Sequence, residues 1–213
     1  ELAKKYHKKT VTYSVNQKMS DITAKKISQL NTGISFTVGK NKYLLNTIGQ
    51  FNIYNALAAL TVAKHLGIKN QLISKTFKNI ASPPGRMEIL QKKPFLVIID
   101  FAHNQFSLKI ALENLLLVKP TSNSKIITVF GCPGLRDKSR RRMGEISAHI
   151  SNLTIITADD PRTEGVEKIS NEIEFWAKQG KALTFDLHQN LTSGSHFYTK
   201  IPDRQQAIKL ALS

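Results

Sequence analysis

The sequence predicts an α/β protein that contains a doubly wound domain with a largely parallel sheet. From residue 95 onward, short apolar runs alternate with helical patterns. Repeated βα units of this kind build parallel sheets with helices on both faces. The runs FLVIID, KIITVF and LTIITA are apolar at almost every position, as expected of strands that are covered on both faces.

The first half of the chain shows a different pattern, in which β-rich segments precede helices. β-Branched and aromatic residues separated by turn residues predict short strands. The expected strands are 9–15, 32–39 and 42–46, and the segment 19–30 fits either a strand or a helix.

Two helices follow these strands. Ile53, Leu57 and Leu60 recur with a helical period, which predicts a helix over 52–66 that stops at Gly67. A second helix is expected over roughly 69–80.

The stretch SPPG at 82–85 is the clearest boundary signal in the sequence. Two prolines and a glycine cannot continue a helix. We therefore divide the chain into domains 1–82 and 83–213.

The second domain contains the alternating strands and helices. The expected strands are 95–100, 125–130, 153–158 and 181–185, and the expected helices are 105–118, 139–150, 166–178 and 204–212, the last capped by Asp203.

Composition limits the function classes. The 213-residue chain has a net charge of +16, which favours nucleic acid, an anionic membrane or phosphorylated small molecules as partners. The lone Cys132 excludes an internal disulfide and fits a reducing, cytoplasmic location. No apolar run is long enough for a bilayer and the start ELAKKYHKK is no signal peptide, so we expect no membrane partner. The sequence does not indicate an oligomeric state.

Three polar stretches, DFAHN, GCPGLRDK and ADDPR, each follow a predicted strand. Ligands of doubly wound sheets bind beyond the carboxyl ends of the strands. The three stretches are therefore predicted to line one functional cleft.

Each candidate residue for nucleotide binding also has a structural interpretation. Asn52 could cap its helix, whereas Asn55 could contact a base or ribose. Arg86, beside a Pro-Gly turn, could be surface charge or could hold a phosphate through its planar fork. Asp100 could cap the following helix or accept hydrogen bonds from two ribose hydroxyls. His103 lies near it in sequence.

The stretch GCPGLRDKSRRR is neither a dinucleotide fingerprint nor a phosphate loop, because it lacks the glycine and lysine spacing of both. It predicts a tight turn before a helix whose N-terminus favours anions. The basic residues there oppose the helix dipole. Either an anionic ligand compensates, or Arg140 to Arg142 form a solvated run.

The stretch ADDPR offers two acids and an arginine. Asp159, Asp160 and Arg162 could recognise a zwitterion, with acids for an ammonium and arginine for a carboxylate. The alternative is a turn that closes onto the next helix. The sequence has no Cys/His metal signature.

Taken together, these segments resemble the Mur ligase family. The matching stretches, in the family's order, are GQFNIYNALAALTVAKHLGI, PGRMEIL, FLVIIDFAHNQFSLKIALENL, VFGCPGLRDKSRRRMGEISAH, IITADDPRTEG and IPDRQQAIKLAL. The resemblance implies the last part of the central ATPase domain over 1–82 and most of the Rossmann-like C-terminal domain, without its last strands, over 83–213.

The resemblance also implies a reaction. It is closest to the family member that adds a diamino acid, here expected to be meso-diaminopimelate, to UDP-MurNAc-L-Ala-D-Glu in peptidoglycan synthesis. ATP and Mg²⁺ would be needed. The family's phosphate loop and magnesium ligands would lie upstream, so we expect this chain alone not to ligate.

Site residues follow from the resemblance by position. Those implied to bind nucleotide are Asn55, Arg86, Asp100 and His103. Those implied to bind the amino acid are Arg136, Asp159, Asp160, Pro161 and Arg162. No catalytic residue is assigned.

The sequence departs from the family's usual GCGGDRDK, DYAHTP and DNPR, reading GCPGLRDK, DFAHNQ and DDPR. Arg162 is retained, and its charge suits the distal carboxylate of diaminopimelate. Asp160 in place of asparagine weakens that inference.

Three alternatives stay open. They are a lysine-adding ligase, a folylpolyglutamate synthase-type ligase, and a basic nucleic-acid-binding module. Low aromatic content, 8%, weighs against the last because stacking on aromatic rings is the usual platform for single strands.

Overall fold

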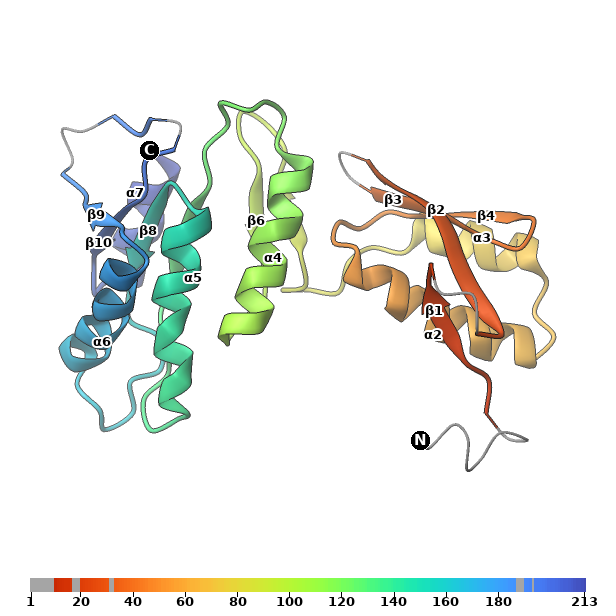
Figure 1. Ribbon diagram of the computed structural model, residues 1–213, viewed down its shortest axis with the longest axis horizontal. Coiled ribbons are helices and arrows are strands. Elements are labelled where there is room, and N and C mark those ends of the chain that lie inside the picture. The colour runs from red at the N-terminus through yellow and green to blue at the C-terminus, as the bar shows by residue number, and fades with distance from the viewer. Residues whose placement is uncertain (1–9, 17–19, 31–32, 187–189, 193) are drawn as a thin grey trace. The chain divides into compact units, whose positions relative to one another are not determined.

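The computed structural model describes residues 10–16, 20–30, 33–186, 190–192 and 194–213. Positions 9, 19 and 32, where three segments of the sequence analysis begin, lie outside the described residues. The chain divides into two compact units, Glu1–Phe101 and Ala102–Ser213, which are described separately (Figure 1). The boundary placed after residue 82 stays a prediction.

The first unit contains a four-stranded sheet in the order β1-β2-β3-β4, with β1 parallel to β2 and the other pairs antiparallel. Of the ambiguous segment 19–30, residues 22–30 therefore form a strand. The bounds are β1 (Tyr13–Val15), β2 (Ile22–Leu30), β3 (Gly33–Val38) and β4 (Asn41–Leu45).

Helices α2 (Phe51–His65) and α3 (Asn70–Asn79) contribute to the same apolar core as this sheet. Leu57 and Leu60 from the predicted stripe are fully buried. Phe36 and Tyr43 stack with ring centroids 5.5 Å apart. This core is almost entirely apolar, as burial without polar partners requires.

A two-stranded antiparallel sheet ends the first unit. It pairs β5 (Glu88–Gln91) with β6 (Val97–Ile99). The prediction of a central parallel strand at 95–100 is wrong. An apolar run indicates a strand but does not indicate which strand it pairs with. Here β6 pairs with β5, which lies only a short turn upstream.

The second unit contains a parallel four-stranded sheet in the order β7-β8-β10-β9. Three of these strands were predicted, whereas β10, which holds the short mixed sequence FYTK, was missed. The bounds are β7 (Ile127–Phe130), β8 (Leu153–Ile156), β9 (Leu183–Thr184) and β10 (Phe197–Lys200).

Helices cover both faces of this sheet (Figure 1). Ile156 faces a core shared with α4, α5 and α6, whereas Leu153 and Ile155 pack with α7. This alternation is what strands buried on both faces require. The predicted α/β, doubly wound class is confirmed. The helices are α4 (Gln105–Val118), α5 (Met143–Ile150), α6 (Val166–Gln179) and α7 (Arg204–Leu212).

Three helix starts differ in how well the sequence identified them. Asp203 caps α7 as predicted, accepting from the amide of Gln206 at 2.9 Å. Asn104 caps α4 through a capping box with Ser107, so Asp100 is not the cap. The predicted helix 139–150 begins as the 3-10 helix η2 (Lys138–Arg142) and continues as α5.

Candidate functional site

Two loops leave neighbouring strands at the same edge of the second unit's sheet. We call residues 131–138, after β7, the glycine loop, and residues 158–165, after β8, the acidic loop. Because β7 and β8 are parallel neighbours, their carboxyl ends bring both loops together. The amide of Gly134 donates to the carbonyl of Asp160 at 2.8 Å.

The two glycines of the glycine loop are needed for this close approach. A Cβ atom added to Gly131 would lie 2.3 Å from the Thr157 carbonyl oxygen, and one added to Gly134 would lie 1.9 Å from the Pro161 oxygen. Both neighbours are backbone atoms, which cannot swing aside. The sequence indicated a tight turn here, but the structure gives these glycines a second role, which is backbone contact between loops.

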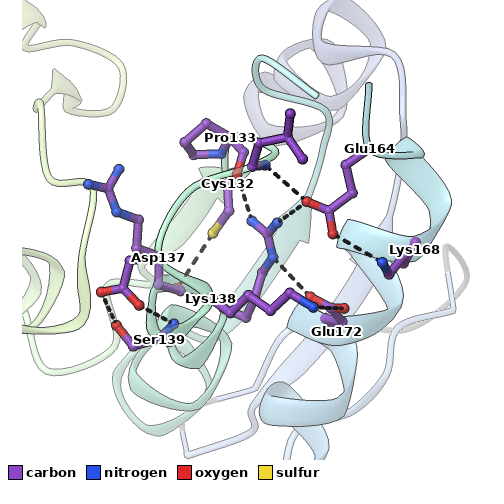
Figure 2. Close-up of polar contacts among 11 residues, drawn as sticks. Cys132, Pro133, Asp137, Lys138, Ser139, Glu164, Lys168 and Glu172 are labelled. Atoms are coloured by element: carbon purple, nitrogen blue, oxygen red, sulfur yellow. Dashed lines mark hydrogen bonds and ion pairs between the residues drawn. The ribbon is translucent and has the colours of Figure 1, made fainter. Parts of the chain in front are cut away.

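A buried arginine links the loops to α6. Arg141, with a side chain 2% exposed, donates from Nε to Glu172 at 3.2 Å and pairs through Nη2 with Glu164 at 3.3 Å. Its Nη1 donates to the Pro133 carbonyl at 3.1 Å. We call Arg141, Glu164 and Glu172 the Arg141 network (Figure 2). A buried guanidinium requires such pairing, because an unpaired one is strongly disfavoured.

The basic run is therefore not one solvated surface, and that interpretation is wrong for Arg141. Arg142 is exposed, pairs with Glu145 at 3.1 Å and stacks over the Trp176 ring at 4.6 Å. Lys138 lies 4.0 Å from Glu172 (Figure 2).

Local hydrogen bonds set the ionisation of the loop carboxylates. The amide of Leu135 is the main cause that lowers the pKa of Glu164, with Arg141 and Lys168 adding to it against the effect of burial. Hydrogen bonds from Ser139 lower the pKa of Asp137. Burial raises the pKa of the Cys132 thiol. Glu164 and Asp137 are thus held as anions, and Cys132 stays a neutral core residue.

The predicted amino-acid residues all belong to the two loops. Arg136, Asp159, Asp160 and Arg162 are exposed, and Pro161 is half-buried. Arg162 Nε lies 3.5 Å from Asp160 Oδ2. Charged groups of both signs that are open to solvent suit a zwitterionic ligand.

The sequence analysis missed Arg204, at the start of α7. Its Nη2 lies 3.5 Å from Asp159 Oδ1, and its Nε donates to the carbonyl of Ala158 at 2.9 Å. Arg204 therefore restrains the first residues of the acidic loop. The signal available in the sequence was its place in the matched stretch IPDRQQAIKLAL, which by itself gives it no partner.

The predicted nucleotide residues are divided between the units. Asn55 is exposed on α2 and donates to Asn52 Oδ1 at 3.0 Å. Asn52 donates to the Ile48 carbonyl at 2.8 Å, and Gln50 takes the cap position of α2. The interpretation of Asn52 as the helix cap is therefore wrong.

The other three nucleotide candidates follow the SPPG stretch. The guanidinium of Arg86 lies over the ring of Phe101 at 4.3 Å. Asp100 is half-buried, and its Oδ2 accepts from the Met87 amide at 2.9 Å. His103, in the second unit, is exposed beside the cap of α4. Their roles stay predictions.

A hollow of about 780 Å³ lies between η2 and α6. It shares Arg141 and Glu172 with the Arg141 network, but neither Arg136 nor Arg162 lines it. The residues predicted to bind the amino acid therefore lie in the two loops and do not line this hollow, and their role stays a prediction.

Within the ranges that the structure describes, no three His, Cys, Asp or Glu side chains are grouped to hold a metal ion. None of the helices described combines the length and hydropathy that crossing a bilayer needs.

Comparison with known families identifies both halves of the chain. Residues 85–213 match the family described as "Mur ligase, glutamate ligase domain", and residues 1–63 match "Mur ligase middle domain".

Named relatives are similar over most of the chain. The UDP-N-acetylmuramoyl-L-alanyl-D-glutamate--2,6-diaminopimelate ligase of Alkaliphilus metalliredigens is 35% identical over the whole chain. The ligase of the same name from Clostridium perfringens is 37% identical over 96% of it. The chain spans 40% of the length of each.

Solved structures agree on the fold. A structure of a ligase with that same name is 28% identical and covers 94% of this chain and 39% of its own, with a TM-score of 0.59. The Mycobacterium tuberculosis folylpolyglutamate synthase is 18% identical, covers 91% of this chain and 41% of its own, and has a TM-score of 0.68. The second likeness concerns fold alone. With one family description matched over residues 85–213, the chain belongs to the Mur ligase family.

Proposed function

We propose that the chain supplies the amino-acid site and part of the nucleotide site of an ATP-dependent ligase. The ligase adds meso-diaminopimelate to UDP-MurNAc-L-Ala-D-Glu in the cytoplasm, as a step of peptidoglycan synthesis. The observation that carries the proposal is the pairing of the glycine and acidic loops, which places Arg136, Asp160 and Arg162 on two adjoining segments. The names of the relatives at 35% and 37% identity support the choice of substrate.

In the proposed reaction, the D-glutamate carboxylate takes the terminal phosphoryl group of ATP to form an acyl phosphate. The amine of the diamino acid attacks the acyl carbon, phosphate leaves, and the nitrogen loses its proton to give the amide. The chain's own residues orient the reactants and balance charge, which are large contributions in such transfers. Arg162 would hold the distal carboxylate, and the acids would hold the ammonium groups.

The nucleotide half of the proposal assigns Asp100 to the ribose hydroxyls and Arg86 to phosphate or ribose. The half-buried carboxylate of Asp100 suits a hydroxyl donor, and the stacked guanidinium of Arg86 keeps its charge. His103 and Asn55 would lie beside the nucleotide. Magnesium, which would balance phosphate charge, would be held by the upstream part of the relatives' chains.

Substitution of Arg162 by alanine in the full-length protein tests the amino-acid site. Losing a charge-assisted hydrogen bond of about 1.5–3 kcal/mol would raise the Michaelis constant for meso-diaminopimelate by about tenfold to a hundredfold. The Michaelis constant for ATP should change by less than about twofold. Weaker binding of the diamino acid does not by itself change the binding of ATP.

Arg142→Ala is the matched control for this experiment. Both arginines form exposed ion pairs, with the Arg142 side chain 46% exposed and the Arg162 side chain 37% exposed, but Arg142 lies outside both loops. Equal effects of Arg162→Ala on the two Michaelis constants would remove Arg162 from the amino-acid site.

The ion pair between Asp160 and Arg162 favours a second candidate, a lysine-adding ligase. An arginine that is already paired with an acid attracts the distal carboxylate of a substrate less strongly. Ligation assays with L-lysine and meso-diaminopimelate side by side distinguish the two, and a folate substrate in the same assay tests the synthase alternative.

A further inference from the structure

Glu164 is the only residue of the acidic loop for which a side-chain hydrogen bond to a glycine-loop amide is recorded among the described residues. Its Oε2 atom accepts from the Leu135 amide at 3.1 Å and from Arg141 Nη2 at 3.3 Å. Its Oε1 atom lies 3.5 Å from Lys168 Nζ. The side chain is 8% exposed, so it lies in a largely dry environment, where Oε1 has the Lys168 ion pair but no hydrogen-bond partner among the described residues (Figure 2).

Leu135 has an unusual backbone conformation, and its amide hydrogen bond to Glu164 helps to hold it. Its φ angle is +52°, in the left-handed region that a residue with a branched side chain rarely occupies. The residue is 61% exposed, so apolar packing contributes little to holding it. The hydrogen bond from its amide to Glu164 therefore restrains this turn, together with the bond from the neighbouring Gly134 amide to the Asp160 carbonyl.

The turn at Leu135 sets the direction in which the backbone enters Arg136. Arg136 follows Leu135 directly, and a left-handed residue reverses the local chain direction. On the other side of the contact, the Glu164 amide donates to the Pro161 carbonyl at 3.0 Å. That bond connects Glu164 to the residue next to Arg162. Glu164 thus touches the segments that carry both arginines.

Arg141 keeps Glu164 in this position. Its remaining nitrogens are used by the Pro133 carbonyl and by Glu172, so the guanidinium is fixed on three sides. A carboxylate held by a fixed guanidinium has little freedom to turn away from the Leu135 amide.

We infer that Glu164 is a positioning residue for the amino-acid substrate. By holding Leu135 in its left-handed turn, it sets the spacing between Arg136 and Arg162, and thereby the length of zwitterion that the two loops accept. The inference rests on the proposed function, since it takes the two loops as the amino-acid site. Glu164 need not touch the substrate.

Kinetics of three variants of the full-length protein test this role. Glu164→Ala should raise the Michaelis constant for meso-diaminopimelate by about tenfold, with kcat and the Michaelis constant for ATP changed by less than about threefold. Glu164→Gln, which keeps an acceptor for the Leu135 amide, should recover most of the loss. Glu167→Ala, which removes an exposed acid from α6, should behave as the wild type.

A second-site variant separates positioning from general stability. Asparagine tolerates the left-handed region better than leucine, so Leu135→Asn added to Glu164→Ala should recover part of the lost affinity. A purely structural role of the buried charge would leave the double variant no better than Glu164→Ala. That result, or equal rises in both Michaelis constants, would overturn the inference.

A measurement on the chain itself keeps the inference testable without ligation. The Leu135 amide proton should exchange faster with solvent and shift upfield in the NMR spectrum of Glu164→Ala, but not of Glu167→Ala. An unchanged Leu135 amide would refute the positioning role. Failure of the wild type to ligate any diamino acid, with the Leu135 amide responding as expected, would instead refute the proposed function.

Discussion

Different forces hold the buried sheet core of the first unit and the paired, largely exposed loops of the second unit. Phe36, Tyr43 and Leu57 bury apolar surface against one another, and the non-directional hydrophobic effect stabilises them. The loops of the second unit are joined by the backbone hydrogen bond from Gly134 to Asp160 and by the Arg141 network. Apolar packing tolerates small shifts, whereas a buried charge network fixes directions as well as distances, which is what a binding loop needs.

The largest expected effect is in the apolar core. Phe36 is fully buried, and Phe36→Ala should lower the free energy of unfolding of the first unit by about 3–5 kcal/mol through lost burial and a cavity. Urea unfolding followed by hydrogen exchange in each unit measures it. Leu30→Ala, at an exposed position of the same sheet, should cost less than about 1 kcal/mol. A similar loss in both variants would contradict the assignment of this core.

The next effect separates the buried network from the surface. Arg141→Met removes one partner of a buried ion pair and should lower the free energy of unfolding of the second unit by about 3 kcal/mol. Arg142→Met breaks an exposed pair and should cost less than about 1 kcal/mol. Thermal unfolding of the two variants compares them directly, and equal losses would show that the Arg141 network does not hold the loops.

The smallest effect concerns pH. Burial of Glu174 opposes its ionisation, but hydrogen bonds from Lys178, Lys200 and Tyr198 outweigh it and lower the pKa from 4.5 to about 2. A carboxylate with a lowered folded-state pKa stabilises the protein above its unfolded value and loses that contribution as the pH falls through the folded value. The second unit should therefore lose stability between pH 4.5 and about 2.

The Glu174→Gln variant tests the source of this pH dependence. Its melting temperature should fall less steeply over the same range, although Asp137 and Glu164, whose pKa values are also lowered, keep some slope. In the first unit the exposed Asp21, with a pKa lowered mainly by the Thr12 amide, should contribute less. A wild-type slope that is unchanged in Glu174→Gln would exclude Glu174 as its main cause.

Periodicity predicted the elements that local patterns determine. The stripe of Ile53, Leu57 and Leu60 gave α2, and the apolar runs gave β7 and β8. The prediction of a strand at 95–100 was correct, but its placement in the parallel sheet was wrong, because which strands pair depends on contacts that are distant in sequence. β10 was missed because its four residues carry too little pattern.

The candidate site shows the same division. The glycine loop and the acidic loop followed from position at the strand ends, whereas the third predicted stretch, DFAHN, follows β6 and not a strand of the parallel sheet. The burial of Arg141 could not be predicted, because an arginine inside a basic run has the same local sequence whether it faces solvent or carboxylates contributed by residues 164 and 172. Arg204 was missed for a similar reason, since its partner Asp159 is far away in sequence.

The backbone approach at Gly131 and Gly134 has a consequence for protein engineering. Since neither glycine leaves room for a side chain, the two loops cannot be redesigned one at a time without changing how they mesh. Altering which diamino acid is accepted would call for transplanting both segments together, along with the arginine and the glutamate that join them. In a library that diversifies only one loop, most variants of that loop would no longer fit against the unchanged loop.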